Sequence, residues 1–446
     1  MEAFPSLARN DEQTPGLRRE LTLLDSIMIN VGTIIGSAIF IVPATVALHV
    51  QSSTLAVMAW VAGGIVSLLG ALSVAELGAA MPHAGGQYVY LREAYGPMWG
   101  FLYGWTAFAV ISSASIAAIA IGFAQYLGYF VQLNVFGIKA IAILSIIFLT
   151  TINCFGLKFG AWTQNTFTFA KIAALVALFT LGFILPAGSS KNFLPLLPAQ
   201  SWLSLLGPFG LAMVEVLWAY DGWIEITYVA GEVKNPQRHL AAAIIFSTAI
   251  VIAIYILINF AYIHVLSVPR MAHSQLVASE AATTMMGKSG AVLITLAILI
   301  SMFGANNGII FTSARIPYAM AKERLFFHAL SHVHVKWRTP VTALVIQGMW
   351  ACLLALTGTY RQLITYVIFA SWIFYAMSCG AVILLRRKAP YLTRPYKTWG
   401  YPFTPLVFIF VALWLVINTI IHDPRDAAIG AGLIVLGLPA YFYWKA

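Results

Sequence analysis

Three carboxyl residues stand inside a strongly apolar stretch of the sequence, LAMVEVLWAYDGWIEI, at 211–226. They are Glu215, Asp221 and Glu225. A charged side chain near the centre of a bilayer costs roughly 2.5 to 3.5 kcal/mol on insertion scales. Asp221 and Glu225 are four residues apart and share a face of a continuous helix, whereas Glu215 points elsewhere. These carboxyls therefore need protein or water around them, and the pair Asp221-Gly222 predicts a break in the helix.

Different roles are open to these acids. At a break, Asp221 can cap a helix N-terminus, carry a proton, or receive the amino group or side chain of a bound molecule. Glu225 and Glu232 lie toward a basic segment of the sequence, and we expect them to pair with basic loops. Glu215 is expected to be neutral and hydrogen-bonded, because burial disfavours its charged form.

One lysine also stands in an apolar stretch, NTFTFAKIAALVALFTLGFILP. Lys171 lies about two turns from the polar loop that precedes this stretch. Its long side chain can extend back to the membrane surface. Alternatively, it places a fixed ammonium inside the protein, in the sort of position where sodium-coupled carriers bind an ion. The residues alone leave both interpretations open.

The remaining reactive residue types give no sign of catalysis or metal binding. The cysteines Cys154, Cys352 and Cys379 fall in apolar stretches, at separations that suggest neither a disulfide framework nor a zinc site, so free thiols are expected. His328, His332 and His334 are expected to lie in a solvated loop. The sequence contains no H-E-x-x-H, G-x-S-x-G, P-loop or paired-cysteine motif. We therefore expect no enzyme activity, no cofactor and no metal.

The composition is that of a polytopic membrane protein. Of the 446 residues, 61% are hydrophobic and 9% are charged, and the mean hydropathy is +0.86. A membrane helix needs about 20 apolar residues, and runs of that kind recur along most of the chain. The twelve predicted spans are 22–48, 53–80, 96–127, 137–156, 163–186, 204–230, 239–266, 291–321, 340–357, 360–385, 401–421 and 426–444.

The distribution of basic residues predicts the orientation. An even number of spans places both termini on one side of the membrane. On this assignment 18 of the 25 lysines and arginines lie on the side of the termini and 6 on the other. The first side is therefore cytoplasmic, and the expected location is the plasma (inner) membrane. The net charge of +10 does not indicate nucleic-acid binding, because clusters such as LLRRKAPYLTRPYK are typical of topology signals and lipid headgroup contacts.

Two spans contain residues that interrupt helices, at NVGTIIGSAIF and at LWAYDGW. Irregular backbone at membrane depth persists only where it is buried in protein or lines a polar cavity. The interruptions correspond if spans 1–5 and 6–10 form two inverted halves, as in many secondary transporters. The expected organisation is a disordered tail at 1–20, repeats at 21–190 and 200–390, and two last helices at 400–446.

Such interruptions have a binding chemistry of their own. Free N–H groups at a half-helix N-terminus attract an anion and unwound carbonyls attract a cation, so an amino-acid zwitterion fits both. The alternative for Gly32 and Gly36 is a G-x-x-x-G face that lets two helices approach closely. The presence of the second interruption, and of Ser37 after Gly36, favours the binding interpretation.

The segment AELGAAMPHAGGQYVYLREAYG, residues 75–96, resembles the signature of the amino acid, polyamine and organocation superfamily, in which a cytoplasmic re-entrant loop follows the second span. Further segments resemble the light-subunit-like branch of the L-type amino acid transporter family. They are TIIGSAIF, TQNTFTFAKIAAL, LWAYDGW with GEVKNPQRHL, YILINFAY, FTSARIPYAMA and RPYKTWGYP. The resemblance covers roughly residues 20–420. It implies an all-α membrane protein with twelve helices in a LeuT-like five-plus-five inverted repeat, and sodium-independent exchange of L-amino acids.

The resemblance also implies a substrate site. The backbone around Ile35, Gly36, Ser37 and Ala38 would hold the substrate carboxylate. Carbonyls near Trp218 and Ala219 would hold its ammonium, and Trp218 would form the aromatic gate over the substrate. Lys171 matches a lysine that links the two broken helices in place of sodium, and Tyr255 matches a tyrosine near the site.

Two departures from the family pattern bear on substrate and partners. Ala38 replaces the second glycine of the usual Gly-Ser-Gly, so a methyl group narrows the pocket or changes the approach of the carboxylate. The loop LGYFVQLNVFGIK lacks the cysteine that joins heteromeric members to a heavy chain, so no disulfide-linked heavy subunit is expected. Trp218 and Ala38 favour small or medium neutral substrates. Asp221 leaves open a cationic amino acid (arginine or lysine) or a polyamine, and a nutrient sensor or a channel is a further alternative.

Overall fold

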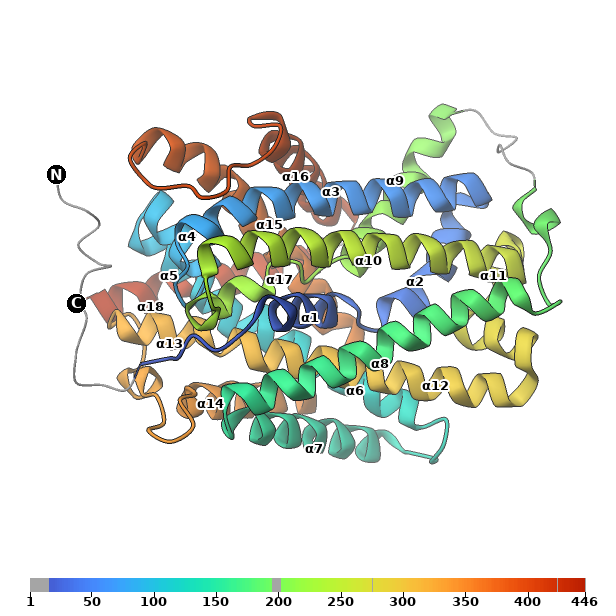
Figure 1. Cartoon of the computed structure of the whole chain (residues 1–446), viewed down its shortest axis with the longest axis horizontal. Helices are drawn as coiled ribbons and strands as arrows, with labels where there is room; N and C mark the ends of the chain where they lie inside the picture. The colour runs from blue at the N-terminus through green and yellow to red at the C-terminus, as the bar shows by residue number, and fades with distance from the viewer. Residues whose placement is uncertain (1–15, 195–201, 275, 423, 446) are drawn as a thin grey trace.

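The computed structural model describes residues 16–194, 202–274, 276–422 and 424–445. Within these residues the fold is almost entirely helical, and the single β-type pairing is an isolated bridge between Leu21 and Val233. Most of the helices run along the long axis of the molecule, and the two described ends of the chain lie at the same end of the bundle (Figure 1). This placement agrees with an even number of membrane crossings.

The first half of the chain contains five predicted spans. Its helices are α1 (Leu23–Ile34), α2 (Ala38–Val50), α3 (Ser53–Ala80), the short α4 (Gln87–Tyr95), α5 (Pro97–Thr106) continued through a π-helical turn (Ala107–Ile111) into α6 (Ser112–Leu127), α7 (Val135–Cys154) and α8 (Leu157–Ile184). The first span is thus divided into α1 and α2, as predicted.

The second half begins after a short 3₁₀ turn, Ser190–Phe193. Its elements are α9 (Trp202–Ala219), the 3₁₀ segment η4 (Glu225–Glu232), α10 (Pro236–Leu266), α11 (Val268–Ala272), α12 (Val277–Ser313), α13 (Arg315–Lys322), the 3₁₀ turn η5 (His328–Ser331), α14 (Val341–Thr357), α15 (Tyr360–Lys388), α16 (Phe403–His422), α17 (Pro424–Val435) and α18 (Gly437–Lys445). The sixth predicted span, 204–230, is α-helical only as far as Ala219.

The helices confirm the prediction of a multi-pass membrane protein. Among the described residues, nine helices are long and apolar enough to cross a membrane. The pair α1 and α2, bent by 44°, forms a further span. The two remaining predicted spans coincide with the shorter apolar helices Ser204–Ala219 and Val341–Thr357. Every predicted span therefore corresponds to a helix or to a broken helix.

Helix α1 lies at the centre of the bundle, packed against α8, α10 and α12 (Figure 1). A capping box starts it: Thr22 Oγ1 accepts from the Asp25 backbone N–H at 3.2 Å, and Asp25 Oδ2 accepts from the Thr22 N–H at 2.8 Å. The helix ends at Ile34, because Ile35 is extended, with φ −76° and ψ 90°. The capped N-terminus of α1 and its end at Ile34 place the interruption of the first span in the middle of the molecule.

The end of the bundle that holds both described chain ends is tied together by several contacts. The backbone N–H groups of Glu20 and Leu21 both donate to the Glu232 carbonyl at 2.9 Å, and Lys234 N–H donates to the Leu21 carbonyl at 2.8 Å. Beneath them, Arg315 of α13 pairs with Glu232 at 2.8 Å, and both side chains are fully buried. The segment before α1 is thereby joined to the end of η4.

The basic segment LLRRKAPYLTRPYK differs from its predicted use. Arg386 binds Glu76 at 2.5 Å and Arg394 binds the same carboxylate at 3.3 Å. The Lys388 ammonium donates to the Ala94 carbonyl at 3.0 Å. The expectation that this cluster contacts lipid headgroups is therefore wrong for Arg386 and Arg394, because a buried acid of α3 binds both; for the exposed Lys388 it stays a prediction.

Candidate functional site

The two predicted interruptions lie against each other. Gly222 lies three residues beyond the end of α9. Its φ is +111°, a backbone conformation that residues with a Cβ rarely adopt. A Cβ built on it would lie 3.2 Å from the backbone nitrogen of Ile34 and 3.2 Å from the carbonyl carbon of Thr33. The Thr33 hydroxyl also donates to the Gly222 carbonyl at 3.4 Å. Glycine is thus required where the sixth span crosses the end of α1.

The glycines of the first interruption have separate uses. A Cβ on Gly32 would lie 2.1 Å from Gln164 Nε2 and 2.3 Å from Thr168 Oγ1, so Gly32 allows α8 to approach α1 closely. A Cβ on Gly36 would meet no atom within 4 Å. The packing interpretation therefore applies to Gly32, whereas Gly36 faces open space at the break.

The first break leaves the N-terminus of α2 without a side-chain cap. Ser37 precedes α2 and makes no side-chain capping bond, so the N–H groups of the first turn of α2 have no cap from it. Ile35, Ser37 and Ala38 are all buried. The positive end of the α2 dipole therefore faces the interior of the protein rather than water.

Lys171 is fully buried, and all three of its ammonium hydrogens have partners. Nζ donates to the carbonyls of Gly32 at 2.9 Å, Ile35 at 2.7 Å and Ser301 at 2.9 Å. The interpretation in which this lysine extends back to the membrane surface is wrong. The family resemblance implied that this lysine links the two broken helices. In the structure its ammonium joins the α1 break to α12, and no hydrogen remains for a bond to α9.

Ser301 strengthens the same junction. Its hydroxyl lies 2.9 Å from the Gly36 carbonyl and 3.2 Å from the Ile35 carbonyl. Together, the α12 serine and the α8 lysine bind the unwound carbonyls that follow α1. Sequence reasoning missed Ser301, since serine is common in membrane helices and nothing in LISMFGANNG marks this one.

Two further side chains stabilise the second break. Asn30 of α1 donates to the Trp223 carbonyl at 3.0 Å, and its Oδ1 accepts from the Ile226 N–H at 3.3 Å. Asp221 Oδ1 accepts from its neighbour's backbone, Gly222 N–H, at 2.9 Å and from the Tyr375 hydroxyl of α15 at 2.8 Å. Neither Asn30 nor Tyr375 was predicted, because their partners are distant in the sequence. The Trp223 carbonyl is 193 residues from Asn30, and Asp221 is 154 residues from Tyr375.

Glu225 and Glu232 have different partners. Glu225 Oε2 accepts a hydrogen bond of 2.5 Å from the Thr312 hydroxyl of α12, and Glu232 pairs with Arg315. The expectation that Glu225 pairs with a basic loop is wrong, because the 3₁₀ turn directs it to α12. The basic partner expected for Glu232 exists, but it belongs to a buried helix and not to a loop. The neutral state expected of Glu215 stays a prediction.

Aromatic side chains pack beside the first break. The Tyr255 hydroxyl of α10 donates to the Ile34 carbonyl at 3.2 Å. The Tyr255 ring contacts Trp60 and Tyr220, with ring centroids 5.5 and 5.1 Å away. Ala219 is buried, and Trp218 is partly exposed and packs against the core. The predicted residues 35–38, 171 and 255 thus lie together at the break after α1. Residues 218–221 lead into the second break, which crosses the first at Gly222.

The histidines and cysteines form no comparable centre. The His328 and His332 rings lie 5.3 Å apart, and across the described ranges no group of three His, Cys, Asp or Glu residues is placed to hold a metal. Cys154, Cys352 and Cys379 are free thiols.

Comparison with known proteins places this geometry in a family. Residues 21–442 match the model of the amino acid permease family. The chain is 36% identical over 438 residues to the serine/threonine exchanger SteT of Bacillus subtilis (strain 168), covering 96% of this chain and 98% of that protein. It is 35% identical over 443 residues to the b(0,+)-type amino acid transporter 1 of Mus musculus, covering 97% and 90%. It is 31% identical over 450 residues to the cystine/glutamate transporter of Homo sapiens, covering 98% and 88%.

Proposed function

Because the chain belongs to the amino acid permease family, we propose that it is a sodium-independent exchanger of small or medium neutral L-amino acids that works by alternating access. Family membership makes it a twelve-span transporter with a LeuT-like fold, not an enzyme. The observation that carries the proposal is the contact between the two broken helices, in which Gly222 lies against the backbone of Thr33 and Ile34.

The broken helices suit a molecule that bears both charges. We assign the substrate carboxylate to the backbone of Ile35, Gly36, Ser37 and Ala38, where the N-terminus of α2 is buried and Gly36 faces open space. We assign the substrate ammonium to the carbonyls of Trp218 and Ala219, at the carbonyl end of α9. Trp218 would close over the substrate, and Tyr255 would fix the end of α1 beside it.

Lys171 supports independence from sodium. Its ammonium donates to the Gly32 and Ile35 carbonyls at the end of α1, where it supplies the positive charge that a bound sodium ion would bring to the same kind of oxygen ligand. A covalently held cation cannot be exchanged with solution. The transport cycle then needs no ion gradient at this position, and substrate gradients alone drive exchange.

Asp221 supports a neutral substrate. Its Oδ1 already accepts two hydrogen bonds, from Gly222 and Tyr375, which makes it a part of the break itself. The relative SteT is named a serine/threonine exchanger. The alternative, a cationic amino acid or polyamine exchanger, requires that Asp221 also bind a positively charged side chain. A sensor or a channel is the remaining alternative.

Exchange is tested with the purified protein in proteoliposomes. We expect labelled serine to enter vesicles preloaded with serine faster than empty vesicles, at the same rate with and without sodium. Unlabelled alanine, serine and leucine should compete more strongly than arginine. Equal uptake into loaded and empty vesicles would indicate a uniporter or channel, and arginine as the strongest competitor would favour the cationic alternative.

The membrane arrangement completes the proposal. We place the protein in the plasma (inner) membrane with both termini in the cytoplasm, supported by the 18 of 25 basic residues on the terminal side. The halves 21–190 and 200–390 would move relative to each other, with 400–446 outside the repeat. The loop 127–139 lacks a cysteine, which supports a transporter without a disulfide-linked heavy subunit.

A further inference from the structure

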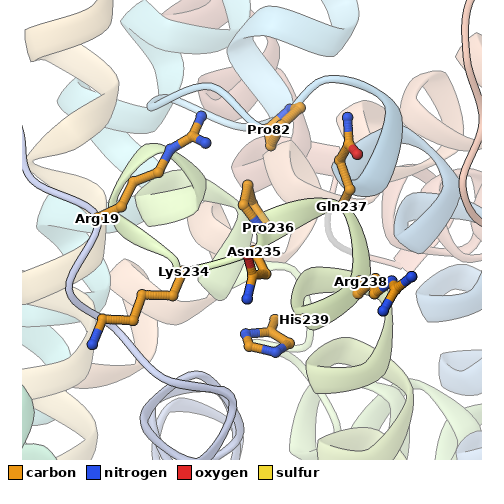
Figure 2. Close-up of a pocket in the computed structure, with 8 residues that line it drawn as sticks. All are labelled: Arg19, Pro82, Lys234, Asn235, Pro236, Gln237, Arg238 and His239. Atoms are coloured by element: carbon orange, nitrogen blue, oxygen red, sulfur yellow. The ribbon is translucent and has the colours of Figure 1, made fainter.

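A cavity of about 800 Å³ opens at the end of the bundle that holds the described chain ends, away from both helix breaks. Three segments that are distant in sequence meet there: the segment before α1, the loop after α3, and the connection from η4 into α10. Figure 2 shows Arg19 and Lys234 on one side of Pro236, and Gln237 and Arg238 on the other. The lining residues are Arg19, Pro82, Lys234, Asn235, Pro236, Gln237, Arg238 and His239.

The lining is basic and contains no acid. Among the described residues no carboxylate lies within ion-pair distance of Arg19, Lys234 or Arg238, whereas Arg315 and Arg386 at the same end of the bundle are each paired. Exposed lysine and arginine chains of this length can turn toward a common anion. Three unpaired cations around one cavity therefore favour a negatively charged ligand.

Two polar features add donors to the same cavity. Helix α10 begins there with Pro236 and is 31 residues long, and its N-cap Asn235 makes no side-chain capping bond. The positive end of the helix dipole is thus left for another group. The His239 ring also lines the cavity, one turn into the same helix. Oxygen atoms of a phosphate are suited to both features.

The position of the cavity relative to the bilayer points to a lipid. Because α10 crosses the membrane, its first turn lies at the membrane surface, on the side that carries most of the basic residues. Anionic lipid headgroups attract such clusters at this depth. We propose that the cavity binds a phosphate-bearing anion, supplied by the headgroup of an anionic phospholipid and held by Arg19, Lys234 and Arg238.

An anion in this cavity would lie between the segment before α1 and the end of η4. Arg19 and Lys234 flank the bridge between Leu21 and Val233, so one anion contacting both adds a link between the segment before α1 and the end of η4. The anion would stabilise this end of the protein in its joined arrangement. Any effect on transport rests on the proposed exchange function, but the binding itself does not.

The test measures thermal unfolding of the full chain in detergent as phosphatidylglycerol, phosphatidylcholine or inorganic phosphate is added. The variants are Arg19→Gln/Lys234→Gln/Arg238→Gln and, as the matched control, Arg387→Gln, which removes an exposed arginine outside the cavity. Phosphatidylglycerol should raise the wild-type Tm, and phosphatidylcholine should not. Each basic residue near an anionic headgroup is worth on the order of fivefold in affinity, so the triple variant should need on the order of a hundredfold more phosphatidylglycerol.

The outcomes separate the possible sources of the anion. If inorganic phosphate raises Tm in the wild type and not in the triple variant, the anion site stands and its ligand is soluble. If phosphatidylglycerol stabilises the triple variant as well as the wild type, the proposal is overturned. An equal loss in Arg387→Gln would overturn it too, because the effect would then be one of overall charge. The substituted side chains are exposed, so each variant is expected to fold.

Discussion

Lys171→Met is expected to reach the membrane and to lose exchange activity by at least about a hundredfold. Methionine fills a similar volume but leaves the carbonyls of Gly32, Ile35 and Ser301 without the donor they share. Each buried acceptor left unsatisfied costs about 1 to 3 kcal/mol. The peptide groups after α1 would then turn to find other donors and would lose the arrangement that we propose receives the substrate carboxylate. The measurement is the initial rate of serine exchange per reconstituted molecule.

Two variants serve as controls for this result. Lys158→Met removes an exposed lysine from the same helix, where the ammonium lies 3.9 Å from Glu20, and should leave exchange nearly unchanged. Ser301→Ala removes the hydroxyl that supports the Gly36 carbonyl and keeps the ammonium, so an intermediate loss is expected. A Lys171→Met protein with near wild-type turnover would contradict the role given to this lysine.

Arg315→Met is expected to give the largest loss of stability. Arg315 and Glu232 are both fully buried and bonded at 2.8 Å, so removing the guanidinium leaves a buried carboxylate without a cation. Breaking a buried pair in this way costs about 3 to 5 kcal/mol. The Glu232 carbonyl also receives the N–H groups of Glu20 and Leu21, so the segment before α1 should loosen as well. The midpoint of thermal unfolding in detergent measures the effect.

A double variant distinguishes the loss of the pair from the loss of packing. Arg315→Met/Glu232→Gln leaves no charge in the site and should recover a large part of the lost stability. Arg270→Met breaks the exposed pair with Glu280, whose side chains are 49% and 31% exposed, and should cost less than about 1 kcal/mol. If the double variant is no more stable than Arg315→Met, the destabilisation comes from lost packing and not from the unpaired carboxylate.

The spans and their interruptions were predictable because they depend on local residue types. Apolar runs of sufficient length mark helices, and Gly36-Ser37 and Asp221-Gly222 mark the places where helices end. The start of α12 at Val277, well before the predicted 291, was not predictable. The backbone leaves helical values at Gly287 (φ 64°, ψ −150°), so the residues before this kink form a separate helical piece, whose mixed composition reads as a loop.

The site was predictable in position but not in its bonds. The sequence indicates which residues lie at the breaks, because the adjacent pairs Gly36-Ser37 and Asp221-Gly222 disfavour a continuous helix. It does not indicate that the Lys171 ammonium would bind carbonyls about 130 to 140 residues away, nor that Thr312 and not a cation would bind Glu225. Those partners are determined by how α1, α8 and α12 pack together.

The assignment of Arg386 and Arg394 to lipid failed for the same reason. A cluster of basic residues reads alike whether it faces headgroups or a buried acid, and Glu76 is more than three hundred residues from Arg386. The three cations around the cavity, Arg19, Lys234 and Arg238, were less conspicuous in the sequence because Arg19 is more than two hundred residues from the other two.

The central claim, that the paired breaks hold both charges of an amino acid, is tested most directly by equilibrium binding of labelled serine to the purified protein. The competitors are unlabelled serine, serine methyl ester and N-acetylserine. The methyl ester lacks the carboxylate charge, and the N-acetyl derivative lacks the ammonium charge. The account predicts that serine displaces the label and that each blocked derivative binds at least about a hundredfold more weakly, since buried backbone N–H groups or carbonyls at one break are then left without a partner. A blocked derivative that competes as well as serine would contradict it.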